Sequence, residues 1–269
     1  MFDGADVIYV YDGSFHGLLC CVFECFVKKE TPAAVLSEEE CQPSLLEMRI
    51  IPTDEAKAKR VENGILNKIS AAAMRLVHDG YYTCVPERGL LILKFVQIGM
   101  ERGVRVMSML GDETVSALIK AVSHRAREAD HYRGFARFSI YGEVMVSVIE
   151  PKNFVLPLIG PHFCDRYRNE SFMIYDKTHS AALIYRPCEW EIIHIDGYTE
   201  PETLDEEAAY RSMWKMFYET IAIKERENSK CRMSHMPKRF WSQMTEMDES
   251  VSALKEGQSP SHSLQSPRR

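Results

Sequence analysis

The hydrophobic pattern of this chain changes once, near residue 131, and the change limits the folds open to it. Over about 54–131, apolar side chains recur at intervals of three and four, which is typical of amphipathic helices. Over 134–196 they form short runs separated by turn residues, which is typical of strands. Helical and strand segments that do not alternate favour the α+β class with a mostly antiparallel sheet.

The expected elements follow from the places where each pattern begins and ends. Gly80 and Gly103 stop the first two helices, and Asp112 is a good cap for the third. The predicted helices cover about 54–79, 87–102 and 112–130. The predicted strands lie within 134–149 on both sides of a turn at 141–142, in a hairpin of 171–175 with 181–185, and at 190–195, with a short helix at 157–167.

The chain opens with a short strand, a tight turn and an amphipathic helix, in ADVIYVYDGSFHGLLCCVFECFVKK. Asp12 and Gly13 end the strand, and Ser14 is a good N-cap for the helix. A doubly wound α/β fold begins in the same way, so α/β is the alternative fold class. Residues 29–53 read as loop with one short strand at 45–51.

We expect one α+β domain over residues 1–247. It would combine the helical segment (about 54–131), a sheet assembled from 1–12 and 134–196, and a C-terminal helix with a basic-aromatic segment (204–241). The C-terminal helix is predicted over 204–228, with a buried stripe of Met213, Trp214, Phe217, Tyr218 and Ile221. Residues 248–269 are polar and rich in Ser and Pro, so we expect a disordered tail.

Composition excludes several classes of protein. No apolar run approaches 18 residues, and the start carries acids where a signal peptide needs cations, so we expect a cytoplasmic protein that does not contact membrane. Its eight cysteines are then expected to be reduced, and no C-x-x-C pair exists. Cys20, Cys21 and Cys25 lie in an apolar run and read as core residues, with a metal or redox site as the alternative. The histidines have no metal-binding spacing, so we predict no metal and no cofactor.

A basic-aromatic segment, KERENSKCRMSHMPKRFW at 224–241, stands out from the acidic background. It holds six Lys or Arg against two Glu, a local charge of +4 in a chain of net charge -6. It ends in Lys238, Arg239, Phe240 and Trp241. Cations bind phosphates and aromatic faces stack on bases, so the segment indicates a nucleic-acid ligand. The alternatives are a solvated helix face and a core anchor at Trp241.

A second basic block, SHRAREADHYRGFARF at 123–138, carries the same chemistry. Its candidate nucleic-acid contacts are Arg125, Arg127, Arg133 and Arg137, since guanidinium groups match phosphate geometry. Arg127 and His131 are four residues apart and would share a helix face. The alternative is a set of surface pairs with Glu128 and Asp130.

Two groups of residues could supply acid-base chemistry. His162, Asp165 and Arg166 would share one helix face, where the carboxylate could orient the imidazole and Arg166 could grip an anion, nucleic acid included. Asp12, Ser14 and His16 lie at a strand end and a helix N-terminus, which suits a phosphate or an acid-base pair. The alternatives are a salt-bridged surface face and an ordinary capped turn. No nucleophile motif such as G-x-S-x-G occurs.

Four blocks of sequence, taken together, resemble a known family. YDGSFHGLLCCVFECF, HRAREADHYRGFARF, VLPLIGPHFCDRYRNESFMIYD and ERENSKCRMSHMPKRFW occur in this order within about residues 5–247. They resemble bacterial proteins described as probable DNA metabolism or putative DNA repair proteins. The resemblance implies a role beside a radical-SAM protein of DNA modification or repair, and some members are fused to a uracil-DNA-glycosylase-like domain. This chain is expected to be the stand-alone form. The resemblance implies no reaction and assigns no residue a role.

Three functions fit these observations. The first is a nucleic-acid-binding accessory protein in DNA repair or modification, with DNA, a radical-SAM protein and a glycosylase-like protein as expected partners. The second is an enzyme acting on a damaged base or nucleotide, with His162 and Asp165 as acid and base. The third is a protein-only adaptor for the radical-SAM partner, docking through the acidic residues at 200–207 and the tail.

Overall fold

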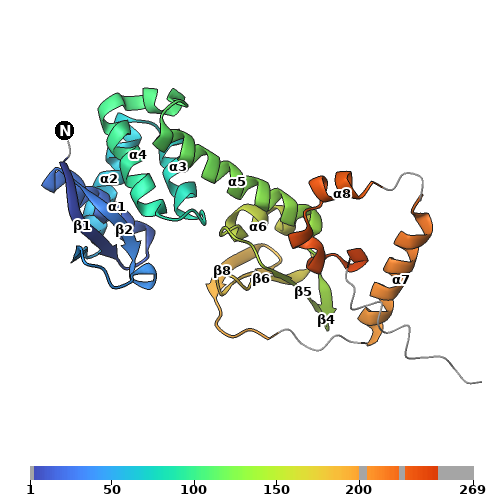
Figure 1. Cartoon of the computed structure of the whole chain (residues 1–269). Coiled ribbons are helices and arrows are strands. Elements are labelled where there is room, and N and C mark those ends of the chain that lie inside the picture. The colour runs from blue at the N-terminus through green and yellow to red at the C-terminus, as the bar shows by residue number, and fades with distance from the viewer. Residues whose placement is uncertain (1–2, 200–204, 224–227, 248–269) are drawn as a thin grey trace, which may run out of the picture. The chain divides into compact units, whose positions relative to one another are not determined.

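A computed structural model describes residues 3–199, 205–223 and 228–247 (Figure 1). Contacts divide the chain into two compact units: unit 1 comprises 1–128 with 152–155, and unit 2 comprises 129–151 with 156–269. The expected tail at 248–269 and most of the acidic segment at 200–207 lie outside the described residues. Among those described, no helix is long and apolar enough to cross a membrane.

Unit 1 contains a three-stranded parallel sheet in the order β2-β1-β3. Strand β1 (Asp3–Tyr11) is central and leads through helix α1 (Phe15–Lys28) to β2 (Glu30–Ser37); the short helix η1 (Glu38–Glu40) and a loop then lead to β3 (Glu47–Ile50). The strand-turn-helix opening and the short strand near 45–51 were both predicted. Strand β2 was not, because Pro32 lies within it. The sheet tolerates Pro32 because β2 is an edge strand and its register with β1 is irregular at Ala5.

The other helices of unit 1 share one hydrophobic core with this sheet. They are α2 (Glu55–Lys68), α3 (Ala71–Tyr81), α4 (Arg88–Arg102), the short η2 (Gly103–Ser108) and the first part of α5 (Glu113–Phe135). The predicted single helix over 54–79 is wrong, because the chain breaks at Ile69 and Ser70. There the Ser70 side chain caps α3 by accepting a hydrogen bond from the Ala73 amide at 3.1 Å. Cys20, Cys21 and Cys25 are buried in the core, as predicted.

Unit 2 contains a five-stranded mixed sheet in the order β4-β5-β6-β7-β8. The strands are β4 (Ser139–Tyr141), β5 (Val144–Ile149), β6 (Ser171–Asp176), β7 (Ala181–Arg186) and β8 (Glu189–His194). Only β5 and β6 run parallel, and helix α6 (Leu156–Arg166) connects them. The protein therefore combines helices with a parallel and a mostly antiparallel sheet. The expectation that residues 1–12 join the second sheet is wrong, since β1 pairs with β2 and β3.

Within the described residues, the C-terminal part of unit 2 holds α7 (Asp205–Ile221), α8 (Ser229–His235), η4 (Lys238–Gln243) and η5 (Thr245–Met247). The predicted helix over 204–228 ends earlier, at Ile221. Its stripe, expected to be buried, is largely exposed, with Met213, Trp214, Phe217 and Ile221 between 45% and 57% accessible. Amphipathic spacing predicted the helix correctly but could not show that few contacts cover its apolar face.

Candidate nucleic-acid interface

Phe240 fixes the basic-aromatic segment to unit 2. Its side chain is fully buried, with ring centroids 5.0 Å from His131, 5.1 Å from Tyr132 and 5.6 Å from Phe135. All three partners lie on the last turns of α5, beside which Figure 1 shows the C-terminal segment. This position corrects the prediction that Phe240 contacts a base, because a side chain inside the core offers no face to a ligand. The alternative of a core anchor, expected at Trp241, therefore applies to its neighbour Phe240 instead.

Glu246 provides a second attachment close to the end of the same segment. Its carboxylate accepts a hydrogen bond from Trp214 Nε1 at 3.0 Å and lies 3.6 Å from Arg137 Nη2. Met244, two residues before it, is buried. Residues 238–247 are therefore held by an aromatic anchor at one end and a charged contact at the other. The end of the second basic block, residues 131–137, therefore contacts a part of the chain that lies about a hundred residues later in sequence, within unit 2.

Trp241 is partly buried and surrounded by cations. Its Nε1 donates a hydrogen bond to the Met236 carbonyl at 2.9 Å. Arg232 Cζ and Lys238 Nζ lie 5.5 and 5.7 Å from its ring centroid, within the range of cation-π attraction. An indole held in this way is a pre-oriented aromatic surface with positive charge over its ring. The segment thus presents cations and an aromatic group together, as sequence predicted.

Three buried polar atoms around this segment have no hydrogen-bond partner within the described residues. They are His131 Nδ1, Arg232 Nε and Gln243 Oε1. Most buried polar atoms in proteins are hydrogen-bonded, so three such atoms near one docked segment mark it as polar and incompletely satisfied.

Arg133 and Arg137 are only partly available to a ligand. Arg133 forms an ion pair with Asp130 and donates to the Leu158 carbonyl at 2.6 Å, so it also holds α5 against α6. Arg137 pairs with Glu246, yet 41% of its side chain is exposed. The surface-pair alternative therefore applies to Arg133, while Arg137 remains accessible.

Arg125 is a structural residue of unit 1, which corrects its prediction as a nucleic-acid contact. Only 2% of it is exposed; Nη1 lies 2.9 Å from Asp79 Oδ1 and Nε donates to the Phe154 carbonyl at 2.8 Å. Its guanidinium also lies over Tyr82 at 5.1 Å. Burial lowers the pKa of Arg125, and Asp79 opposes that shift. The neighbouring Arg127 is exposed on the same helix.

The predicted acid-base pair on α6 is not assembled. His162, Asp165 and Arg166 all lie on α6 and are exposed, so the helix was predicted correctly. Asp165 Oδ1, however, accepts from Arg168 Nη2 at 2.6 Å, and among the described residues no hydrogen bond joins it to His162. Arg166 lies over the ring of Tyr167 at 5.5 Å. The salt-bridged alternative therefore describes this face.

Asp12, Ser14 and His16 form a capped turn at the end of β1. Asp12 accepts hydrogen bonds from the Ser14 amide at 2.9 Å, the Ser14 hydroxyl at 2.7 Å and Thr53 Oγ1 at 2.7 Å. Partial burial raises the pKa of Asp12, but the bonds from Ser14 and Thr53 outweigh it and lower the pKa overall. His16 lies 4.0 Å from Glu62 and does not contact Asp12. The capped-turn alternative fits best.

Sequence reasoning missed several residues that matter locally. Thr53 and Glu246 are single polar residues whose partners lie far away in sequence. Asp176 is fully buried and accepts from the amides of Thr178 and His179 and from His179 Nδ1 at 2.7 Å. Burial raises its pKa. Its signal in the sequence was only the turn DKTHS. No group of three or more potential metal ligands occurs within the described residues.

Comparison with known protein families identifies the family of this chain. The model of the family described as a domain of unknown function, DUF4130, matches residues 86–246. The chain belongs to the DUF4130 family. The matched stretch runs from just before α4 to Glu246 and includes both basic blocks and Phe240. No curated protein and no solved structure matches the chain.

Proposed function

We propose that this DUF4130 protein is a nucleic-acid-binding accessory protein in DNA repair or modification. The observation that carries the proposal is the docking of Phe240 on α5. It brings Arg232, Lys238, Arg239 and Trp241 into the same unit as Arg137. A local cluster of this kind can bind phosphates even in a chain of net charge -6, because attraction between exposed charges acts within about 10 Å.

The chemistry of the cluster favours single-stranded or opened nucleic acid. Arg232 and Lys238 contact an aromatic ring, and no ion pair to an acid involves either of them within the described residues. Trp241 could exchange one of these cations for a base, since stacking a base on an aromatic side chain contributes about 1–3 kcal/mol. Phosphates would then replace the ring as the partners of the displaced cation.

The expected partners come from the resemblance to proteins of DNA metabolism. A radical-SAM protein of DNA modification or repair would act on the nucleic acid that this chain holds. A glycosylase-like protein would be a further partner.

Fluorescence-anisotropy titration of labelled single-stranded and duplex oligonucleotides tests the proposal. The variant Lys238→Ala/Arg239→Ala should bind at least about tenfold more weakly, because two phosphate contacts are lost. The matched control is Lys59→Ala/Lys94→Ala, which removes the same charge from exposed positions of unit 1. Equal weakening in both variants would mean that net charge alone is being measured. Unchanged affinity in the first variant would remove this segment from the interface.

A second candidate function is the protein-only adaptor for a radical-SAM partner, which the exposed face of α7 favours. Tyr210, Trp214, Phe217 and Ile221 follow one another at intervals of four, three and four, and each is at least 45% exposed. Contiguous exposed apolar surface is typical of protein interfaces. Phe217→Glu should abolish co-purification with the partner, whereas Ile140→Glu, at a comparably exposed position of β4, should not. Retention of the partner by Phe217→Glu would count against the adaptor. The enzymatic alternative stays a prediction, without support from the geometry at His162 and Asp165.

A further inference from the structure

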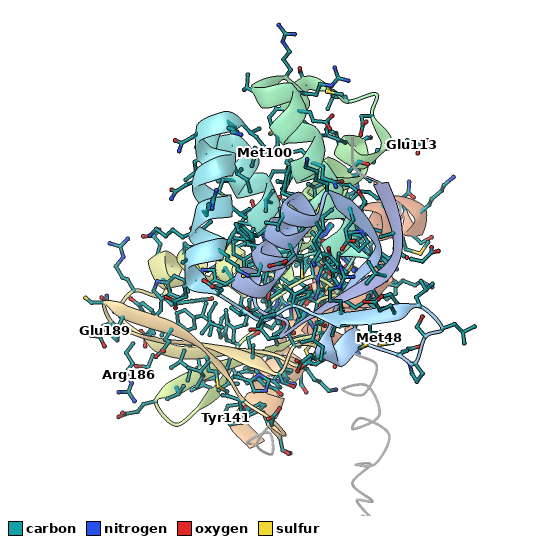
Figure 2. All side chains as sticks on the ribbon, turned by 90° about the vertical axis from the view of Figure 1, so that its left-hand side faces the viewer. Met48, Met100, Glu113, Tyr141, Arg186 and Glu189 are labelled. Carbon is teal, nitrogen blue, oxygen red and sulfur yellow. The ribbon has the colours of Figure 1, made fainter. Side chains whose placement is uncertain are left out.

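Unit 1 contains an open groove far from the proposed nucleic-acid contacts in sequence, which we call the α2 groove. Its volume is about 550 Å³, within the range of small-molecule sites. Helices α1, α2 and α4 supply its walls, with Met100 of α4 at one side (labelled in Figure 2). The lining residues are Phe23, Phe26, Val27, Arg60, Val61, Gly64, Lys68 and Met100.

Helix α2 contributes residues to this groove at regular intervals. Arg60, Gly64 and Lys68 are spaced by four residues, so they lie along one face of the helix. The two cations are roughly 12 Å apart along the axis, at 1.5 Å per residue. Gly64 lies between them, and a Cβ built there would approach Met100 Cε to 3.1 Å. The absence of a side chain at residue 64 therefore keeps the middle of the groove open.

The two cations of the groove have no acidic partner in the part of the chain that the structure describes. Within the described residues neither Arg60 nor Lys68 makes an ion pair. Glu24, an acid on α1 next to Phe23, pairs instead with Lys57, whose Nζ lies 2.8 Å from its carboxylate. Arg60 lies over the Phe23 ring at 5.7 Å. The floor is apolar, from Phe23, Phe26, Val61 and Met100. An apolar floor between two cations is complementary to a molecule with an apolar body and an anionic group.

We propose that the α2 groove binds an elongated apolar molecule that carries an anionic group, such as a long-chain carboxylate. The chain would lie over Gly64 against Phe26 and Met100, and the carboxylate would pair with Arg60 or Lys68. Burial of each methylene against the floor favours binding by up to about 0.8 kcal/mol, and a charged hydrogen bond fixes the head group. This site is independent of the proposed nucleic-acid interface.

Methyl NMR of the full-length chain provides a site-specific test. The protein is labelled at methionine ¹³Cε, and the Met100 signal is assigned by its disappearance in Met100→Leu. Dodecanoate is then titrated below its micelle concentration, with dodecyltrimethylammonium as a probe of the same chain length and opposite charge. We expect the Met100 signal to shift with dodecanoate at micromolar concentrations, and at least tenfold more dodecyltrimethylammonium to be needed for an equal shift.

Two variants and a control separate this site from adventitious binding. Gly64→Leu fills the groove without weakening the helix, because Leu has a higher helix propensity than Gly, and it should abolish the dodecanoate response. Arg60→Ala/Lys68→Ala should weaken binding about tenfold, while Lys59→Ala, an exposed cation outside the groove, should leave it unchanged. No shift of Met100 in the unmodified protein would overturn the proposal. Equal binding by Gly64→Leu, or equal affinity for the two probes, would overturn it as adventitious binding.

Discussion

The basic block at 123–138 spans both units and uses arginine differently in each. In unit 1 it carries Arg125, which is 2% exposed and contacts Asp79, Tyr82 and the Phe154 carbonyl. In unit 2 it carries Arg137, which is 41% exposed and has one longer ion pair, at 3.6 Å. The difference shows that a basic block in the sequence can divide into a structural part and a surface part within twelve residues.

The same contrast extends to the aromatic residues at the end of unit 2. Phe240 and Trp241 are adjacent in sequence, but Phe240 is buried against α5 and Trp241 lies at the surface among cations. Anchoring and ligand contact are therefore assigned to neighbouring residues. Substitution of Phe240 should change the stability of unit 2, and substitution of Trp241 should change the affinity for DNA, so the two roles can be separated.

The largest expected effect is that of Phe240→Ala. Removing this buried ring should lower the free energy of unfolding of unit 2 by about 3–4 kcal/mol and release the basic-aromatic segment. Urea denaturation followed by tryptophan fluorescence measures this directly, because Trp190, Trp214 and Trp241 all belong to unit 2. Phe240→Leu, which keeps most of the packing, should lose less than half as much. A stability unchanged by Phe240→Ala would contradict the anchor.

Arg125→Ala should have the next largest effect, on stability alone. Breaking a fully buried ion pair costs about 3–5 kcal/mol, and we expect about 2 kcal/mol here because Asp79 is 36% exposed and water can replace its partner. Arg127→Ala, two residues away and exposed, should stay within about 0.5 kcal/mol. Thermal unfolding by circular dichroism compares the two. If Arg125→Ala were neutral for folding but weakened DNA binding, the division of this basic block into structural and surface parts would be wrong.

A smaller effect is expected for Trp241→Leu, on affinity. Loss of one stacking surface should weaken single-stranded DNA binding about fivefold, corresponding to about 1 kcal/mol, and should change duplex binding less. Anisotropy titrations with both forms of DNA provide the measurement. A variant that weakens duplex and single-stranded binding equally would argue against stacking at this residue.

The smallest effects concern two aspartates whose pKa values shift in opposite directions. The pKa of Asp12 is lowered, so its contribution to stability is present above the ordinary pKa near 4 and disappears as the pH falls through the lower folded value. Burial raises the pKa of Asp176, so its contribution is present at low pH and disappears as the pH rises through the folded value.

Unfolding free energies measured between about pH 2 and 7 test both signs. Asp12→Asn should remove part of the loss of stability on acidification. Asp176→Asn should remove part of the loss on raising the pH. Slopes that stay unchanged in either variant would show that the corresponding carboxyl does not titrate with folding.

The secondary structure was predicted well from the sequence, because helices, strands and turns depend on residues that are close in sequence. The bounds of α4, the hairpin of β6 with β7 and the capped turn at Ser14 all follow from periodicity and turn residues. Strand β2 and the break before α3 were missed. The first depends on edge position and the second on a single serine cap, and neither changes the hydrophobic pattern.

The candidate site was harder to predict because it depends on contacts between distant residues. Nothing near Phe240 in the sequence shows that it packs on α5, and nothing near Arg125 shows that Asp79 and Phe154 surround it. The buried stripe assigned to α7 failed for the same reason, since amphipathic spacing identifies an apolar face but not its partner. The basic-aromatic chemistry itself was visible in the sequence, because composition alone carries it.

The most direct test of the central claim is the salt dependence of DNA binding, compared between the unmodified chain and Arg232→Ala/Lys238→Ala/Arg239→Ala. Each phosphate contact contributes about 0.7 to the slope of log affinity against log salt concentration for single-stranded DNA. We expect a steep slope for the unmodified protein, and a slope smaller by about 2 for the triple variant. An absence of binding at low salt, or a slope unchanged by the triple substitution, would contradict the central claim.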